Sequence, residues 1–184
     1  MREIEIKARI TDKPALLKQV IRNNILLSEP ITQRDQVFGL PDTPGGTVGR
    51  PWLRIRTETR NGIVKYLFTL KKSVTNQLDS IEHETEIVDA IELEQIINHL
   101  DFSPYSDLTK TRRKAQVGDI EICVDSVAGL GDFIEAEKLT REDANYEEVV
   151  GELWKLLESL GVSKDDKVTD GYDTLQRKLD GLPL

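Results

Sequence analysis

MREIEIKARI, residues 1–10, is the stretch on which the interpretation of this sequence depends. Charged and apolar side chains alternate along it, with acids first and bases after them. Such alternation is typical of a β-strand that has one apolar face and one polar face. The charged face, which carries Glu3, Glu5, Lys7 and Arg9, is expected to lie either in water or against a charged ligand.

The composition limits the classes of protein to which the chain can belong. It has 184 residues, 32% of them charged, and a formal net charge of -8. This charge disfavours a general nucleic-acid binder, which needs an excess of Lys and Arg to bind phosphates. The single cysteine, Cys123, excludes an internal disulfide and, with only two histidines, a structural zinc site. Without a membrane-length apolar run or a signal segment, we expect one cytoplasmic domain over residues 1–184.

The same alternation returns in further segments, each of which is predicted to be a strand. The predicted strands are residues 2–10, 31–38, 52–60, 63–72, 80–88, 108–116, 118–125 and 132–138. Turn signals at Asn61-Gly62 and at Gly118 indicate hairpins, and therefore antiparallel neighbours. Helical spacing of apolar residues predicts helices after Asp12, around 93–100, across 143–160, and near 175–179.

Charges of both signs occupy the polar face of nearly every predicted strand, whereas the opposite face is apolar. Two architectures have this pattern. In an open sheet, helices cover the apolar face and the charges lie in water; in a closed barrel, the charges line the lumen and the helices lie outside. The pattern alone favours the open sheet, because a charged alternating face is usually solvated. A barrel lumen crowded with charges would need a charged ligand.

Seven motifs follow one another in a fixed order along the chain. The first is Glu3-x-Glu5-x-Lys7, and the later blocks are QRDQVF (33–38), WLRIR (52–56), FTLKKS (68–73), KTRRKA (110–115), DSVAGLGDFIEAE (125–137) and GYDTLQ (171–176). Together they resemble the CYTH superfamily of triphosphate tunnel enzymes, whose signature is ExExK. Its members include class IV adenylyl cyclases, thiamine triphosphatases and tripolyphosphatases. The resemblance implies an α+β fold, an eight-stranded antiparallel closed β-barrel (a triphosphate tunnel) with helices packed outside, as a single CYTH domain over 1–184.

The resemblance also implies roles for the charged residues. Basic side chains donate charge-assisted hydrogen bonds to polyphosphates, and carboxylates suit magnesium or manganese, the expected cofactor. The residues expected to bind the triphosphate are Lys7, Arg54, Arg56, Lys71, Lys110 and Arg112. The expected metal ligands are Glu3, Glu5, Asp125, Glu135 and Glu137. Lys71 and Asp125 are expected to be catalytic. Local salt bridges are the preferred interpretation for Glu58, Lys65, Lys114 and Glu121.

The resemblance leaves the reaction open. A class IV adenylyl cyclase converts ATP to cyclic AMP and pyrophosphate, by attack of the ribose 3'-hydroxyl on the α-phosphorus. A triphosphatase hydrolyses tripolyphosphate, thiamine triphosphate or a nucleoside triphosphate, by attack of water on the terminal phosphorus. The long loop GLPDTPGGTVGRP, residues 39–51, and the complete 125–137 block look more like the cyclases, which is the leading prediction. A non-catalytic polyphosphate- or nucleotide-binding protein is the third alternative.

SIEHETEI, residues 80–87, departs from the family pattern. Many members carry an arginine just before the glutamates of the fifth strand, whereas this segment has Glu82, Glu84 and Glu86 without one. Its absence lowers the positive charge at one end of the expected tunnel, where a nucleotide's terminal phosphates would be held. The expected partner is a small-molecule triphosphate, bound by a monomer or a homodimer, with neither nucleic acid nor membrane involved.

Overall fold

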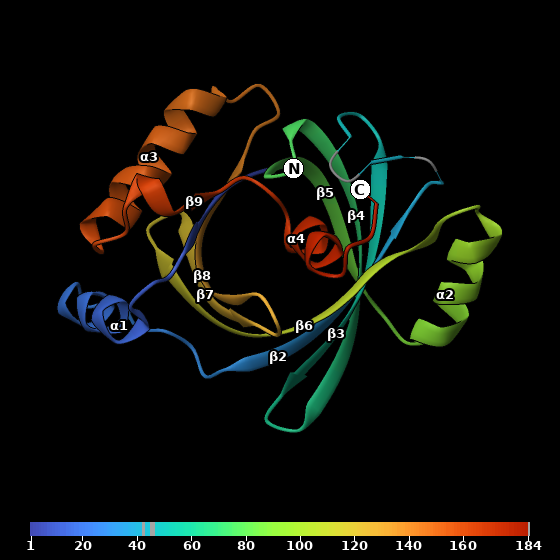
Figure 1. The fold of residues 1–184 in the computed structure, drawn as a ribbon, viewed down its shortest axis with the longest axis horizontal. Helices are drawn as coiled ribbons and strands as arrows, with labels where there is room; N and C mark the ends of the chain where they lie inside the picture. The colour runs from blue at the N-terminus through green and yellow to red at the C-terminus, as the bar shows by residue number, and fades with distance from the viewer. Residues whose placement is uncertain (42, 45–46, 184) are drawn as a thin grey trace.

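The computed structural model describes residues 1–41, 43–44 and 47–183 and contains a closed antiparallel β-barrel (Figure 1). Its strands are β1 (Arg2–Arg9), β2 (Ile31–Gly39), β3 (Pro51–Arg60), β4 (Ile63–Asn76), β5 (Asp79–Ile87), β6 (Ser103–Val117), β7 (Ile120–Val127) and β8 (Gly131–Thr140). They follow one another in the order β5-β4-β3-β2-β6-β7-β8-β1, and pairing of β1 with β5 closes the ring. The predicted eight-stranded antiparallel closed barrel with helices outside is confirmed, and the open sheet is wrong.

Strand β1 closes the barrel because it pairs on both of its edges. Arg2–Arg9 pair with β8, and Arg2–Ile4 also pair with β5. At this seam the Arg2 guanidinium donates from Nε to Asp79 Oδ1 (2.7 Å) and from Nη2 to Asp79 Oδ2 (2.9 Å), and both side chains are buried. Further along the edge of β1 that pairs with β5, the short strand β9 (Lys167–Val168) pairs with Lys7 and Ala8. The glutamates and the lysine of β1 are therefore held on a fully paired strand.

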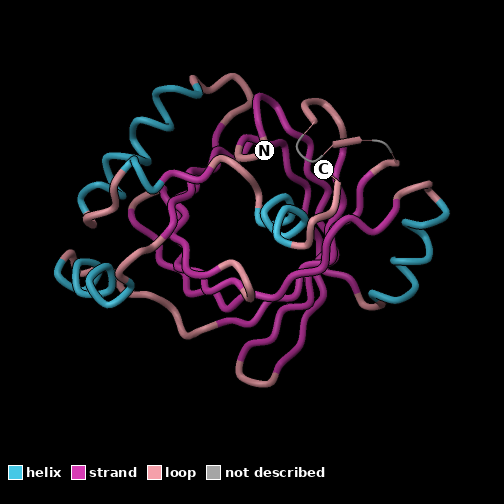
Figure 2. Tube along the Cα trace, viewed as in Figure 1, coloured by secondary structure: helices cyan, strands magenta, loops and turns pink. Residues whose placement is uncertain are grey.

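Helices α1 (Lys13–Arg22), α2 (Ala90–His99) and α3 (Tyr146–Ser159) lie against the outside of the barrel, as Figure 2 shows. The last helix is α4 (Tyr172–Leu179). Helices α1 and α3 pack on β1, β7 and β8 through buried residues such as Leu16, Leu153 and Leu157, while Ile97 of α2 packs on β3. Helix α4 lies across the opening of the ring in the view of Figure 1. Packing of the apolar face against these helices leaves the charged face for the lumen.

The turns explain why neighbouring strands form hairpins. Asn61 and Gly62 both have positive φ, at 50° and 78°, and Gly118 has φ of 63°. This left-handed backbone suits asparagine and glycine, so the two predicted hairpins are confirmed. The prediction for the 39–51 loop falls partly on residues 42 and 45–46, outside the described ranges. No helix in the described part of the chain has the length and apolar character needed to cross a membrane.

Candidate active site in the barrel lumen

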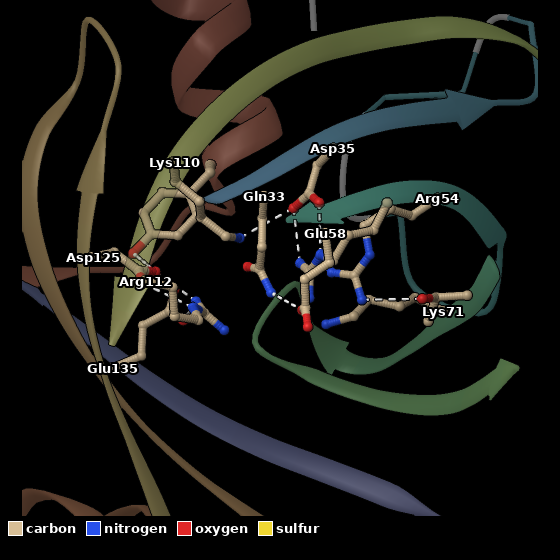
Figure 3. A network of polar contacts seen from close by, with 12 residues as sticks. Gln33, Asp35, Arg54, Glu58, Lys71, Lys110, Arg112, Asp125 and Glu135 are labelled. Carbon is tan, nitrogen blue, oxygen red and sulfur yellow. Dashed lines mark hydrogen bonds and ion pairs between the residues drawn. The ribbon is translucent and has the colours of Figure 1, made fainter. Parts of the chain in front are cut away.

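The charged faces of the strands meet in a cavity of about 430 Å³ inside the barrel. The predicted site residues that line it are Glu3, Glu5, Lys7, Arg54, Arg56, Lys71, Lys110, Arg112, Glu135 and Glu137. Asp125 is fully buried behind Arg112. Figure 3 shows several of them pointing toward one another from different strands: Arg54, Lys71, Lys110, Arg112, Asp125 and Glu135. The structure thus brings together all the basic residues that were predicted to bind a triphosphate.

Arg112 joins two of the predicted metal ligands on one side of the lumen. Its guanidinium donates from Nε to Asp125 Oδ1 (2.8 Å), from Nη2 to Asp125 Oδ2 (2.5 Å), and from Nη2 to Glu135. The Tyr172 hydroxyl, from the first turn of α4, donates to Asp125 Oδ2 at 3.0 Å. Lys7 Nζ lies 3.2 Å from Glu135 Oε1. Both carboxylates therefore neutralise buried cations in this structure.

The other predicted metal ligands, Glu3, Glu5 and Glu137, form a cluster that Lys7 links to Glu135, since Lys7 Nζ lies 3.1 Å from Glu5 Oε1 and 3.2 Å from Glu135 Oε1. Ligand oxygens of Glu3, Glu5 and Glu137 lie within 4.8 Å of one another. Burial raises the pKa of all three carboxyls, and for Glu3 burial and the carboxylate of Glu82 outweigh Lys71 and raise it to about 7. Hard oxygen ligands that repel one another in a buried site fit a divalent cation such as magnesium or manganese. Of the predicted metal ligands, Glu3, Glu5 and Glu137 are therefore the ones whose ligand oxygens the structure brings close together.

Glutamates of β5 form ion pairs with two of the predicted triphosphate-binding residues, Lys71 and Arg54. Lys71 Nζ forms an ion pair with Glu82 and lies 3.5 Å from Glu3 Oε1. Arg54 Nη2 lies 3.3 Å from Glu84 Oε2. Burial opposes ionisation of Glu82, but Lys71 and Arg54 together lower its pKa to about 2. Glu82 is therefore an ionised carboxylate beside Lys71.

The predicted local ion pairs are largely present. Lys114 Nζ lies 2.6 Å from Glu121 Oε1, and Lys65 Nζ lies 3.1 Å from Glu86 Oε2 at the exposed surface. Glu58 instead accepts a hydrogen bond from Gln33 Nε2 (2.8 Å), and has no ion pair among the described residues. These contacts support a structural role for Lys65, Lys114 and Glu121.

Three residues that contact the candidate site had no role in the sequence prediction. Asp35 binds Arg56 and Lys110, Glu82 binds Lys71, and Tyr172 binds Asp125. Asp35 could have been found from its place on the polar face of its strand, which is the lumen face. Tyr172 could not, because no local pattern shows that the start of a helix reaches into the lumen.

The raised pKa of Glu3 predicts how stability changes with pH. Between 4.5, its ordinary value, and about 7, folded Glu3 keeps a proton that the unfolded chain releases. The free energy of unfolding of the metal-free protein should therefore fall as the pH rises through this window, by about 1.4 kcal/mol per unit of pKa difference. Glu82 has a lowered pKa, so its contribution to the free energy of unfolding is lost as the pH falls below 4.5. Urea denaturation at pH 5 and pH 7.5 in the presence of a chelator measures the effect. If the free energy of unfolding of Glu3→Gln changes with pH as much as that of the wild type, the prediction is wrong.

The fold and the lumen define the class of protein: a closed β-barrel whose interior is lined by clustered basic and acidic side chains. The chain belongs to the CYTH domain family, which matches residues 1–172. It is 30% identical over 172 residues, 94% of this chain and 97% of the relative, to a Methanocaldococcus jannaschii protein named "Putative adenylate cyclase MJ0240". It is 26% identical over 174 residues, 94% of this chain and 87% of the relative, to "Adenylate cyclase CyaB" of Aeromonas hydrophila.

A solved structure has the same architecture over nearly the whole chain. The PH1819 protein of Pyrococcus horikoshii superposes with a TM-score of 0.82 at 27% identity, covering 96% of this chain and 98% of its own. The resemblance to the CYTH superfamily stated from the sequence motifs is therefore confirmed.

Proposed function

We propose that this protein is a metal-dependent enzyme that binds a triphosphate in the barrel lumen, with the conversion of ATP to cyclic AMP and pyrophosphate as its reaction. One observation carries the proposal: the six basic side chains predicted to bind a triphosphate and a cluster of three carboxylates line the same cavity. The names of the relatives from Methanocaldococcus jannaschii and Aeromonas hydrophila support cyclisation. A cytoplasmic location and a monomeric or homodimeric state belong to the same proposal.

The carboxylate cluster would hold the cofactor. Glu3, Glu5 and Glu137 would bind magnesium or manganese, and we keep Asp125 and Glu135 as further candidate ligands. A bound divalent ion would supply charge neutralisation and Lewis-acid activation at the phosphates. The three glutamates come from the adjacent, paired strands β1 and β8. Because the barrel fixes both strands, the ligand oxygens need little rearrangement to bind an ion.

The basic residues would bind the phosphate chain and stabilise the charge that develops on it. Phosphoryl and nucleotidyl transfer depend mainly on positioning and on electrostatic stabilisation. Arg54, Arg56 and Arg112 can each bind phosphate oxygens in a bidentate way, whereas Lys7, Lys71 and Lys110 act as point charges. Arg112 is held by Asp125, so Asp125 would keep the guanidinium oriented toward the departing pyrophosphate. We assign the catalytic roles to Lys71 and Asp125.

Hydrolysis of a triphosphate is the second candidate function. Both oxygens of Asp125 already accept hydrogen bonds, from Arg112 and from Tyr172, so the carboxylate has limited capacity to assist a ribose hydroxyl. A protein of the same fold from Hippeastrum, with 19% identity and a TM-score of 0.62, is named a "Putative adenylyl cyclase" that reveals a dominant triphosphatase activity. Tripolyphosphate, thiamine triphosphate and nucleoside triphosphates are the substrates to test.

Product analysis separates these functions. The purified protein is incubated with ATP, tripolyphosphate or thiamine triphosphate, with magnesium or manganese, and the products are followed by phosphorus NMR. We expect cyclic AMP and pyrophosphate from ATP, whereas orthophosphate would support hydrolysis. Binding without turnover would identify a non-catalytic polyphosphate-binding protein. If no triphosphate is turned over and none changes the melting temperature, the proposed function is wrong.

A further inference from the structure

Asp35 is the carboxylate that holds two of the proposed triphosphate-binding residues in place. It lies on β2, directly opposite Arg56 of β3, and its side chain faces the lumen (Figure 3). Arg56 donates from Nε to Oδ1 (2.7 Å) and from Nη2 to Oδ2 (2.8 Å). Lys110 Nζ, from β6 on the other side of β2, donates to Oδ2 at 3.1 Å. One carboxylate thus joins cations from the two strands that flank it.

The three charged side chains of this arrangement are buried, so their interactions are strong. Asp35, Arg56 and Lys110 are 4%, 6% and 4% exposed, so water screens their charges little. The fork uses the Nε and Nη2 edge of Arg56, so the edge that contains Nη1 is turned away from Asp35. Burial and the neighbouring cations Arg112 and Arg56 lower the pKa of Lys110 to about 8, while Asp35 opposes them. Without Asp35, two buried cations would lie side by side with no fixed orientation.

We propose that Asp35 is a positioning residue for the triphosphate site, which orients the Arg56 guanidinium and the Lys110 ammonium group toward the phosphate chain. This inference rests on the proposed function. Asp35 is not expected to touch the substrate, since it is an anion that would repel phosphate. Its contribution is to fix the direction of both donors before the substrate arrives, which lowers the reorganisation needed in the transition state.

The test is the effect of Asp35→Asn on kcat and KM separately. The amide keeps the shape of the carboxylate, but its NH2 group cannot accept from Arg56 or Lys110. We expect kcat to fall by about 10- to 100-fold, the cost of misplacing catalytic groups by about 1 Å. KM should stay unchanged, because the loss of the Asp35 carboxylate also lowers the pKa of Lys110, and the proton that Lys110 then releases offsets the lost negative charge. A merely structural role would not produce this division between kcat and KM.

Asp107→Asn is the matched control. Asp107 of β6 binds Arg34 of β2 through the same fork of Nε and Nη2, but the pair is half exposed on the outer face. Its kcat and KM should equal those of the wild type. Should Asp35→Asn fail to fold by circular dichroism, Asp35→Glu keeps the negative charge while displacing the carboxylate. It should also lower kcat at least about 10-fold without raising KM.

The outcomes separate this inference from the proposed function. If the wild type turns over a triphosphate but the Asp35 variant that folds has a kcat within about twofold of it, Asp35 is not a positioning residue. A rise in KM of about tenfold, with or without a change in kcat, also overturns the inference, because it would mean that Asp35 acts on substrate binding. If the wild type turns over nothing, the proposed function fails and this inference fails with it.

Discussion

Replacing Glu5 by glutamine is expected to lower the turnover of the triphosphate by about 100-fold or more. Glu5 is buried in β1 and belongs to the carboxylate cluster with Glu3 and Glu137. The neutral amide removes one of the charges that would hold the divalent ion. Because that ion supplies several kcal/mol of transition-state stabilisation and each 1.36 kcal/mol is tenfold in rate, a large loss of rate follows.

The measurement is kcat against magnesium and manganese concentration. Glu5→Gln should need more metal to reach half of its maximal rate, and excess metal should restore part of the activity. Glu86→Gln is the matched control, since Glu86 is exposed on β5 and pairs with exposed Lys65. A Glu5→Gln variant with wild-type kcat at low metal would show that the ion binds elsewhere, with Asp125 and Glu135 as the remaining candidates.

The fold could be predicted from local patterns only up to the closure of the sheet. Alternating polarity located the strands within a few residues, and Asn61-Gly62 located a hairpin. The same pattern fits an open sheet, however. Closure depends on the pairing of Arg2–Ile4 with Asp79–Ile81 of β5, which lie 75 to 79 residues further along the chain. No local sequence feature specifies such a distant pairing. The motif resemblance supplied the choice, and the structure confirmed it.

The candidate site could be predicted as a set of residues but not as a set of contacts. Glu5 and Asp125 both lie on the polar face of a strand, which alternation alone indicates. Their partners differ because position around the barrel decides them: Glu5 lies near Glu3 and Glu137, whereas Asp125 binds Arg112. These distances between strands depend on the register and curvature of the whole barrel. A sequence pattern with a period of two contains no information about them.

Replacing Lys71 by alanine is expected to lower kcat/KM by about 100-fold, as loss of a preorganised charge at a phosphate does. Burial lowers the pKa of the Lys71 ammonium group, but Glu82 and Glu3 outweigh burial and raise it, so the group stays charged over the working pH range. Without it, Glu3 and Glu82 lie beside the substrate unshielded and repel its phosphates. KM should therefore rise as kcat falls, in contrast to the effect expected at Asp35.

The double variant Lys71→Ala with Glu82→Gln separates the two causes of this loss. Removing the unshielded Glu82 carboxylate should bring KM back toward the wild-type value, whereas kcat should stay low because no cation replaces the lysine. Lys65→Ala serves as the control, since Lys65 lies on the same strand but is half exposed and pairs with Glu86. If Lys71→Ala keeps wild-type kcat, Lys71 does not act on the reacting phosphate and its ion pair with Glu82 only stabilises the barrel.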